Sequence, residues 1–432
     1  MTHDDEDRRR GPTAARLPGG FTRRDALAAA ALSAALPASL ARPARAAGPS
    51  GAPIVLGWVG PLSPPGGYAE GILMKDAAQM AVEEVNAQGG LLGRPVQVVY
   101  ADTRGQPAEG RAAAERLVQE NKIAAAFGEF HSPVALAEME VFHRYGVPFM
   151  ACDVWSDEVT AKGYAEVFRN STAVSLIDNT IGQWMGAAGF KNVALLAEKN
   201  DVGLAARTAM SEQLKSKGIP FSVVDADPSL TDFTAQILRY KSASPPFDFF
   251  CTEFSEAGAY DLIRQARELG FAPTARCGMY NSGGSAVDPT FWQNVGAAGV
   301  GLCTENVGLA QGAWNDKTHA FAAAFKKRYD ADATGAVMES YDGAWLLFEA
   351  IRSAGSTDAK AIIHALETTN WVGTRGQYSF STEREPAWHY HQFLKAPLTI
   401  IQYSERNQPV TAAPILWPRA EATVEYTYKP PV

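Results

Sequence analysis

The chain has 432 residues, the length of about two ordinary domains, and 46% of them are hydrophobic and 20% charged, a composition that excludes a disordered protein. With 39 Lys and Arg against 47 Asp and Glu, the formal net charge is −8, which gives no support to nucleic-acid binding. The 4 cysteines are too few for a disulfide scaffold, and no apolar stretch reaches the ~20 residues that span a bilayer.

Residues 1–47 have the features of an export signal. A polar segment leads to paired arginines at 23–24, an Ala/Leu-rich run follows at 26–40, and an A-x-A sequence ends at Ala46. The paired arginines resemble a twin-arginine signal. We therefore predict cleavage near Ala46 and a periplasmic location. The alternative, an N-terminal amphipathic helix, fits less well because the run is apolar on all its faces.

Removal of this segment makes the chain more acidic. The segment carries 8 Arg, no Lys and 5 acidic residues, which leaves 31 basic and 42 acidic residues and a net charge of −11. Such a charge favours solubility and opposes binding to anionic surfaces. No cysteine lies at the expected cleavage site, so we expect no lipid anchor. We expect a monomer.

Strand and helix patterns alternate from residue 53 onward. Short apolar runs that end in turn residues indicate strands, and apolar residues at helical spacing indicate helices. The first half predicts strands at Ile54–Val59, Val96–Tyr100, Ala124–Phe127 and Val147–Ala151, with helices at Gly71–Ala87, Pro107–Asn121 and Pro133–Tyr145. This alternation is typical of an α/β fold, a doubly wound parallel sheet with helices on both faces.

The pattern restarts near residue 171 and changes again in the tail. Strands are expected at Val193–Ala197, Phe221–Asp225, Phe247–Cys251, Arg276–Met279 and Gly299–Thr304, and helices at Asn179–Gly189, Gly203–Lys217, Phe233–Ser242 and Glu256–Leu269. Three helices follow, at Asn315–Tyr329, Ala336–Ala354 and Asp358–Thr368. The tail predicts short strands at Gly376–Phe380, His389–Leu394, Leu398–Tyr403 and Thr423–Tyr428.

Several motifs together resemble the branched-chain amino acid (Leu/Ile/Val) family of periplasmic solute-binding proteins. They are Gly57–Ser63, Ala81–Gly90 with Gly93-Arg94-Pro95, Tyr100–Thr103, Gly146–Phe149, Leu262–Gly270 and Glu339–Ala344. The resemblance implies a type I periplasmic binding fold, in which two α/β lobes are joined by three crossovers. Lobe one would be residues 53–170 plus 305–370, and lobe two residues 171–304 plus 371–432.

The resemblance also implies a function. Members of this family capture a small solute between the lobes and deliver it to the permease and ATPase subunits of an ABC importer. A ligand-sensing receptor of the same fold is the alternative. An enzyme is a distant third reading, because no G-x-S-x-G, P-loop or H-E-x-x-H motif occurs. We expect no cofactor.

The loops after the strands supply the candidate site, because ligands bind outside the carboxyl ends of the strands in open α/β sheets. The predicted ligand-binding residues are Tyr68, Glu129, Phe130, His131, Ser132, Asp153, Val154, Trp155, Val202, Phe254, Ser255, Tyr280 and Asn281. Ser132 precedes the helix that begins at Pro133, so it is expected both to cap that helix and to donate to a ligand carboxylate. The resemblance suggests that Tyr68 covers the ligand.

The departures from the family pattern point to the ligand. Trp155 stands where amino-acid binders have a small hydroxyl residue, and Val202 where an aromatic ring is frequent. The loop around Tyr280 has no acid to pair with a ligand ammonium, whose burial without a counter-charge costs several kcal/mol. Asp153 or Glu129 of the other lobe could supply one. We therefore expect an aromatic or hydroxylated carboxylate; branched-chain amino acids and short amides remain alternatives.

Aromatic side chains are expected to form an apolar slot for a flat ring, and the polar residues would serve an amide instead. The slot would be lined by Trp155, Phe130, Phe254, Tyr280 and Tyr68, although some of these rings could belong to the core. An amide would use Asn281, Asp153 and Glu129. His131 is either a ligand contact or a surface histidine.

Two further sets of residues receive structural interpretations. His389 and His391 could place two imidazoles on one strand face, but a third metal ligand is missing, and an exposed strand face is the simpler interpretation. Cys251, Cys277 and Cys303 recur near successive strands, and we expect buried thiols, with a Cys277–Cys303 bridge as the alternative. Cys152 is expected to be structural.

Overall fold

The computed structural model describes residues 50–425 except 255, 283 and 309–310. The predicted export signal lies outside the described residues. Within them, the strands form a five-stranded sheet, a seven-stranded sheet and a two-stranded hairpin. No helix of this part of the chain is long and apolar enough to cross a membrane.

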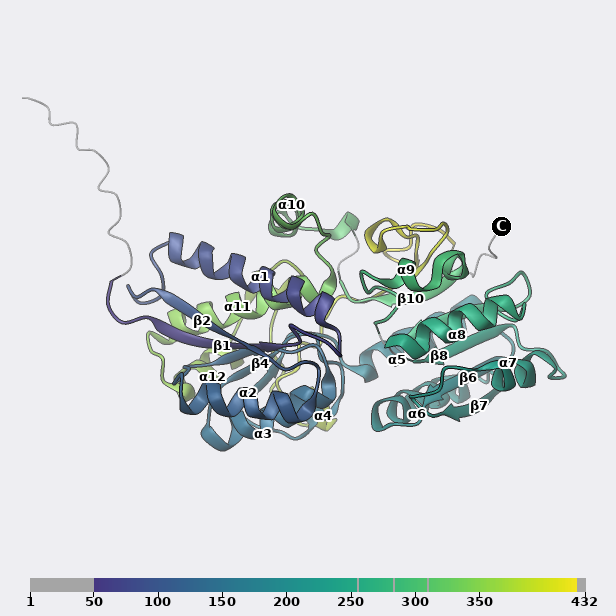
Figure 1. Ribbon diagram of the computed structural model, residues 1–432, viewed down its shortest axis with the longest axis horizontal. Coiled ribbons are helices and arrows are strands. Elements are labelled where there is room, and N and C mark those ends of the chain that lie inside the picture. The colour runs from purple at the N-terminus through teal and green to yellow at the C-terminus, as the bar shows by residue number, and fades with distance from the viewer. Residues whose placement is uncertain (1–49, 255, 283, 309–310, 426–432) are drawn as a thin grey trace, which may run out of the picture. The chain divides into compact units, whose positions relative to one another are not determined.

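The first lobe is built on the five-stranded parallel sheet, whose strand order is β2-β1-β3-β4-β5. Its strands are β1 (Ile54–Gly60), β2 (Val96–Asp102), β3 (Ala126–Gly128), β4 (Phe149–Ala151) and β5 (Val167–Arg169). Its early helices are α1 (Tyr68–Ala87), α2 (Pro107–Gln119), α3 (Ser132–Tyr145) and α4 (Glu158–Ala161). Figure 1 shows α1 and α2 on opposite faces of this sheet.

One glycine fixes the path of the chain where β3 ends. Gly128 has a φ of 123°, and a Cβ atom there would lie 2.2 Å from the carbonyl oxygen of Val59. Only glycine allows the two strands to approach this closely. The next residue, Glu129, also has a positive φ, of 71°. The turn that begins here directs Glu129 to Ser132 away from the sheet and into α3.

The second lobe is built on the seven-stranded sheet, with strand order β14-β13-β10-β9-β8-β6-β7. Its parallel strands are β6 (Val193–Glu198), β7 (Phe221–Ala226), β8 (Phe249–Glu253), β9 (Gly278–Ser282) and β10 (Leu302–Asn306). The antiparallel strands β13 (Thr399–Gln402) and β14 (Ile415–Trp417) extend one edge. Its helices are α5 (Val174–Ala188), α6 (Asp201–Ser216), α7 (Thr234–Lys241), α8 (Glu256–Glu268) and α9 (Phe291–Val295).

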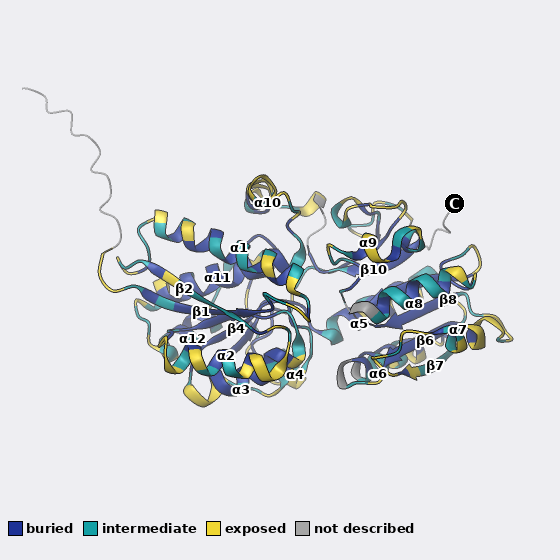
Figure 2. Ribbon diagram, in the orientation of Figure 1, coloured by how far each residue is buried: buried dark blue, intermediate teal, exposed yellow. Residues whose placement is uncertain are grey.

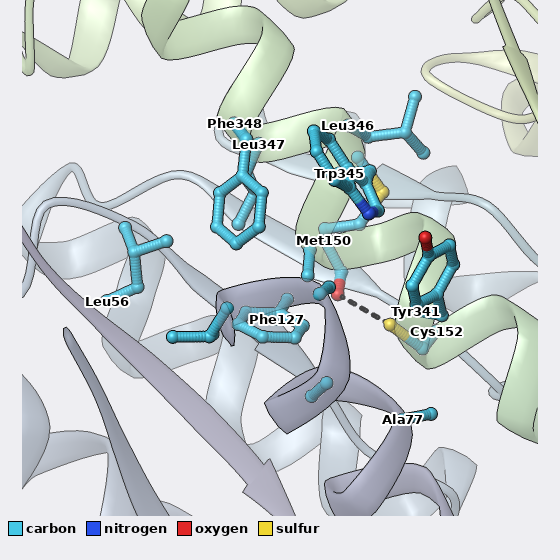
Figure 3. Packing of buried hydrophobic residues seen from close by; sticks show 14 of the residues in the cluster. Leu56, Ala77, Phe127, Met150, Cys152, Tyr341, Trp345, Leu346, Leu347 and Phe348 are labelled. Atoms are coloured by element: carbon cyan, nitrogen blue, oxygen red, sulfur yellow. Dashed lines mark hydrogen bonds between the residues drawn. The ribbon is translucent and has the colours of Figure 1, made fainter. Parts of the chain in front are cut away.

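The late helices return to the first lobe. They are α10 (Asp316–Tyr329), α11 (Gly335–Ala354) and α12 (Ala359–Glu367), and all three contribute side chains to the core around β1 and α1. In Figure 1, α11 lies on the same face of the first sheet as α1, and these two helices pack together. Figure 3 shows Trp345 and Phe348 of α11 above Phe127 of the sheet, and Tyr341 beside Cys152.

The tail divides between the two lobes. The hairpin of β11 (Trp371–Gly373) and β12 (Gly376–Tyr378) packs against α11, and Tyr378 and Phe393 lie in the first-lobe core. The expected boundary at residue 371 is therefore too early, and the tail joins the second sheet only at β13. Among the described residues the chain passes between the lobes three times: after β5, after β10 and before β13. This confirms the expected fold.

The inner strands of both sheets are buried and the edge strands β2 and β7 are mostly half-buried, whereas the outer faces of helices such as α2 and α3 are exposed (Figure 2). Short strands explain most differences from the predicted elements. The strands β5 and β14 have 3 residues each and were not predicted from the sequence. The strand expected at His389–Leu394 is instead a 3₁₀ turn at Ala387–His389 followed by loop. Residues 423–425 form no strand, and the rest of that predicted strand lies outside the described residues.

Candidate solute-binding site

The candidate site is formed by the loops that follow the parallel strands of both lobes. In the first lobe, these loops carry the predicted residues from Glu129 to Ser132 after β3 and from Asp153 to Trp155 after β4. In the second lobe, β8 ends at Glu253 and β9 at Ser282. Since parallel strands present their carboxyl ends at one edge of a sheet, each set of side chains is brought together by the topology.

Trp155 connects the two lobes. Its backbone belongs to the loop after β4, whereas its side chain packs against the second-lobe core cluster that contains Trp184 and Tyr280. A Cβ atom on Gly284 would lie 3.5 Å from Cη2 of the Trp155 ring. The indole is only partly buried. It therefore presents a flat apolar surface where loops of both lobes meet.

Ser132 does not cap α3, contrary to the prediction. It is the first residue of that helix, and the preceding His131 occupies the N-cap position without a side-chain cap. The Ser132 hydroxyl instead accepts the backbone N–H groups of Trp155, at 3.0 Å, and of Ser156, at 3.1 Å. Because a hydroxyl also has one hydrogen to donate, this arrangement leaves Ser132 able to donate to a ligand oxygen.

Asp153 lies beside Trp155. Its Oδ1 atom accepts the indole N–H of Trp155 at 2.9 Å, and the residue is buried. Burial raises the pKa of Asp153, while hydrogen bonds with Glu339 and Trp155 oppose the rise. In this position the carboxyl group fixes the orientation of the indole.

The turn after β3 forms a compact polar cluster with the start of α3. Glu129 is fully buried, and its Oε1 atom accepts the backbone N–H of His131 at 3.1 Å. The His131 ring stands edge-on to Phe130 and contacts the backbone around Gly67. Burial first, and then the neighbouring Glu129, raise the pKa of Glu138 on α3 well above its usual value. His131 is thus partly buried in the turn and is not an exposed surface histidine.

The remaining predicted residues divide into exposed, buried and undescribed positions. Tyr68 begins α1 and is 43% exposed. Val154 is fully buried in the first-lobe core. Val202 lies in α6, but its side chain is outside the description, as is Ser255.

Phe254, Tyr280 and Asn281 are buried parts of the second lobe and do not line an apolar slot. Phe254 packs edge-on against Phe233 in the core. Tyr280 is fully buried near Trp184. The Asn281 side chain is occupied by Thr252 Oγ1 and by the carbonyl oxygens of Phe254 and Ser282. Of the five rings expected to line a slot, Trp155, Phe130 and Tyr68 are the ones whose side chains are not fully buried.

The second lobe also contains a buried acidic cluster that the sequence analysis missed. We define it as Asp178 of α5, Glu253 at the end of β8 and Glu305 of β10, with exposed fractions of 2%, 7% and 1%. Glu305 accepts hydrogen bonds from Tyr280 Oη and, at 3.2 Å, from Ser282 Oγ. The loop around Tyr280 contains no acid, as the sequence shows, but Glu305 of the neighbouring strand β10 places a carboxyl group beside Tyr280. The sequence did contain a signal for this cluster: a glutamate lies at or near the end of two buried strands, in Thr252-Glu253 and Thr304-Glu305.

Two of these acids have oxygen atoms without hydrogen-bond partners. Both carboxyl oxygens of Asp178 and the Oε1 atom of Glu253 are buried and have no hydrogen-bond partner within the described part of the chain. Burial, and then the charge of Glu253, raise the pKa of Asp178 well above its usual value. Burial, and then the charge of Glu305, do the same for Glu253. Buried acceptors of this kind are costly unless a donor reaches them.

The residues considered for metal or redox chemistry have structural roles. Among the described residues, no group of three or more His, Cys, Asp or Glu is arranged to hold a metal ion. His391 is fully buried and bonded to Val167 and Glu367, so the exposed strand face expected for His389 and His391 is wrong. All four cysteines are buried and free, which confirms the expected thiols and excludes the alternative Cys277–Cys303 bridge.

Comparison with known proteins agrees with this architecture. The family model described as periplasmic binding protein matches residues 53–401. The Leu/Ile/Val-binding protein BraC3 of Rhizobium johnstonii is 30% identical over 328 residues, which cover 75% of this chain and 86% of the relative.

Solved structures share the fold. One is the branched-chain amino acid transporter substrate-binding protein LivJ of Streptococcus pneumoniae in complex with isoleucine, with a TM-score of 0.73, 21% identity and coverage of 85% of this chain and 100% of that one. Another is an ABC transporter solute-binding protein of R. palustris in complex with 4-hydroxybenzoate. Its TM-score is 0.72 and its identity 21%, and the match covers 84% of this chain and 95% of that one. The family match and the BraC3 identity show that this chain belongs to the branched-chain amino acid (Leu/Ile/Val) family of type I periplasmic binding proteins.

Proposed function

We propose that this protein is the extracytoplasmic solute-binding component of an ABC importer and that it captures a hydroxylated aromatic carboxylate without altering it. The observation that carries the proposal is the arrangement around Trp155. A flat, partly buried ring packs against the second-lobe core beside the Ser132 hydroxyl of the first lobe, and the second lobe holds buried carboxyl oxygens with no hydrogen-bond partner among the described residues.

Each part of such a solute has a partner. The carboxylate would lie at the amino-terminal end of α3, where the Ser132 hydroxyl and the helix dipole favour negative charge. The aromatic ring would stack on Trp155. A ring hydroxyl would donate to Glu253 Oε1 or to Asp178, whose oxygen atoms have no hydrogen-bond partner among the described residues. The related fold that holds 4-hydroxybenzoate supports this class of solute.

A zwitterionic amino acid is the second candidate, and the acidic cluster favours it. An ammonium group could pair with ionised Glu253 and Asp178, which removes the objection that the second lobe has no counter-charge. The S. pneumoniae structure with isoleucine supports this alternative. The bulk of Trp155, where amino-acid binders have a small hydroxyl residue, argues for the aromatic acid.

Calorimetric titration of the chain without residues 1–47 separates these candidates. We expect 4-hydroxybenzoate to bind more tightly than benzoate, since the hydroxyl reaches an unpaired acceptor, and leucine to bind more weakly than both. Tight binding of leucine without binding of either benzoate would establish the amino acid instead. Accumulation of a chemically altered product would contradict a binding protein of any kind.

A further inference from the structure

Arg169 is a fully buried arginine at the end of β5. Burial lowers the pKa of this guanidinium to about 10. A buried guanidinium is tolerated only when its N–H groups are hydrogen-bonded. The oxygen atoms that accept hydrogen bonds from Arg169 therefore show which segments this side chain restrains.

The guanidinium bonds to the loop that carries Trp155. Nη1 donates to the carbonyl oxygen of Val154 at 3.4 Å and to that of Ser156. Nη2 donates to Thr160 Oγ1 at 3.4 Å. Arg169 thus holds the carbonyl groups on both sides of Trp155.

Other bonds complete the restraint on this loop. Ser132 accepts the N–H groups of Trp155 and Ser156. The carbonyl oxygen of Trp155 accepts the N–H of Val174 at 2.8 Å, and the Ser171 hydroxyl donates to Val154 at 3.0 Å. The loop is therefore bonded on one side to α3 and on the other to the first connection between the lobes.

Arg169 also joins two of the three connections between the lobes. Its Nε atom donates to Oε1 of Gln392. Its backbone N–H donates to the carbonyl oxygen of His391 at 3.0 Å, and its carbonyl oxygen accepts the backbone N–H of Phe393 at 3.1 Å. Gln392 in turn donates to the carbonyl oxygen of Ser171 at 2.8 Å. The Arg169 side chain thus contacts the Trp155 loop and Gln392, and Gln392 extends this network to Ser171 of the first connection.

We propose that Arg169 is a positioning residue that sets the conformation of the Trp155 loop for solute binding and ties it to the segments on which the lobes hinge. The inference rests on the proposed function, in which Trp155 contacts the solute. Arginine suits this role because its planar fork reaches several oxygen atoms at once, whereas lysine has a single ammonium group.

Amide hydrogen exchange tests the positioning role without any solute. In Arg169→Lys, the amides of Trp155 and Ser156 should exchange at least about ten times faster than in the parent chain, because their loop loses two carbonyl restraints. The matched control is Tyr240→Phe, which removes a buried hydroxyl bond to Leu195 in the second lobe. It should leave these two amides unchanged. Equal exchange in Arg169→Lys and the parent overturns the proposal.

A binding cycle then tests the link to the solute. With 4-hydroxybenzoate as the probe, Arg169→Lys should weaken binding about tenfold in the parent chain. The same substitution should change the affinity less than about twofold when Trp155→Ala is already present, because the effects of two residues that act together on binding do not add. Equal effects in both backgrounds overturn the proposal. If Trp155→Ala alone leaves binding unchanged, the proposed site fails while the exchange result still decides the role of Arg169.

Gln392→Met provides a second variant should Arg169→Lys not fold. It keeps the arginine but removes the acceptor of its Nε atom. Faster exchange at Trp155 and Ser156 is again expected, and protection equal to that of the parent chain overturns the proposal.

Discussion

The two sides of the site present different groups. In the first lobe, the backbone groups around Trp155 are bonded to Ser132, Arg169 and Val174. In the second lobe, both carboxyl oxygens of Asp178 and the Oε1 atom of Glu253 are buried with no hydrogen-bond partner among the described residues, as is Glu129 Oε2 in the first lobe. The backbone of the Trp155 loop is therefore already bonded, whereas the buried carboxyl groups could still accept a donor that a solute brings.

The largest effect is expected from Trp155→Ala. Loss of the indole removes both the stacking surface and the contact with the second-lobe core, so 4-hydroxybenzoate should bind at least ~2 kcal/mol more weakly, about thirtyfold in Kd. Trp371→Ala, at a partly buried tryptophan on the hairpin of the first lobe, is the control. Calorimetry measures both, and equal losses would place the solute elsewhere.

Ser132→Ala should have the next largest effect. It removes the acceptor of two loop N–H groups together with the donor assigned to the solute carboxylate, so binding should weaken by ~1–3 kcal/mol. Ser229→Ala, at an exposed serine that bonds to Asp227 in its own turn, should leave the affinity unchanged. Retention of full affinity in Ser132→Ala would show that the first-lobe side does not depend on this hydroxyl.

The acidic cluster should make the protein less stable as the pH rises. The raised pKa of Asp178 means that the folded chain holds a proton that the unfolded chain releases near pH 4. The stabilisation is complete below that pH and is lost as the pH rises towards the folded pKa, by up to ~1.4 kcal/mol per pH unit.

Urea unfolding between pH 5 and pH 8 measures this dependence. Asp178→Asn should flatten it, whereas Glu405→Gln, at an exposed glutamate of the same lobe, should not. A slope that is unchanged in Asp178→Asn would show that Asp178 does not carry the proton.

The smallest effect is expected from reduction. Because the four thiols are free and buried, a reductant should leave Tm unchanged in this chain. A fall in Tm on reduction, together with a gain of two titratable thiols, would reveal a bridge.

The sequence predicts the regular parts of this molecule better than the site. Helices with one apolar face, such as α2, and buried strands, such as β6, follow from their apolar patterns. The strand β5 is too short for a pattern, and Arg169 at its end has a role set by residues more than 200 positions away in sequence.

For the candidate site too, the sequence predicts local features better than contacts between distant residues. The loops after β3 and β4 were found because strand ends mark ligand sites, and the structure does bring Ser132 and Trp155 together. Tyr280 was assigned to a slot because its ring is apolar, but it faces the core, and only the pairing of β9 with β10 brings its hydroxyl to Glu305. Carboxylates from separate strands and from α5 converge through topology, which single motifs do not report.

The contrast between the two sides is tested most directly by comparing the Kd of benzoate with that of 4-hydroxybenzoate in the parent chain and in Glu253→Met. The ring hydroxyl should improve binding about tenfold in the parent chain, because it reaches a buried acceptor, and the preference should fall to about twofold or less in the variant. If the parent chain shows no preference for 4-hydroxybenzoate over benzoate, or if Glu253→Met keeps the full preference, then Glu253 does not accept a hydrogen bond from the solute and the proposed site is contradicted.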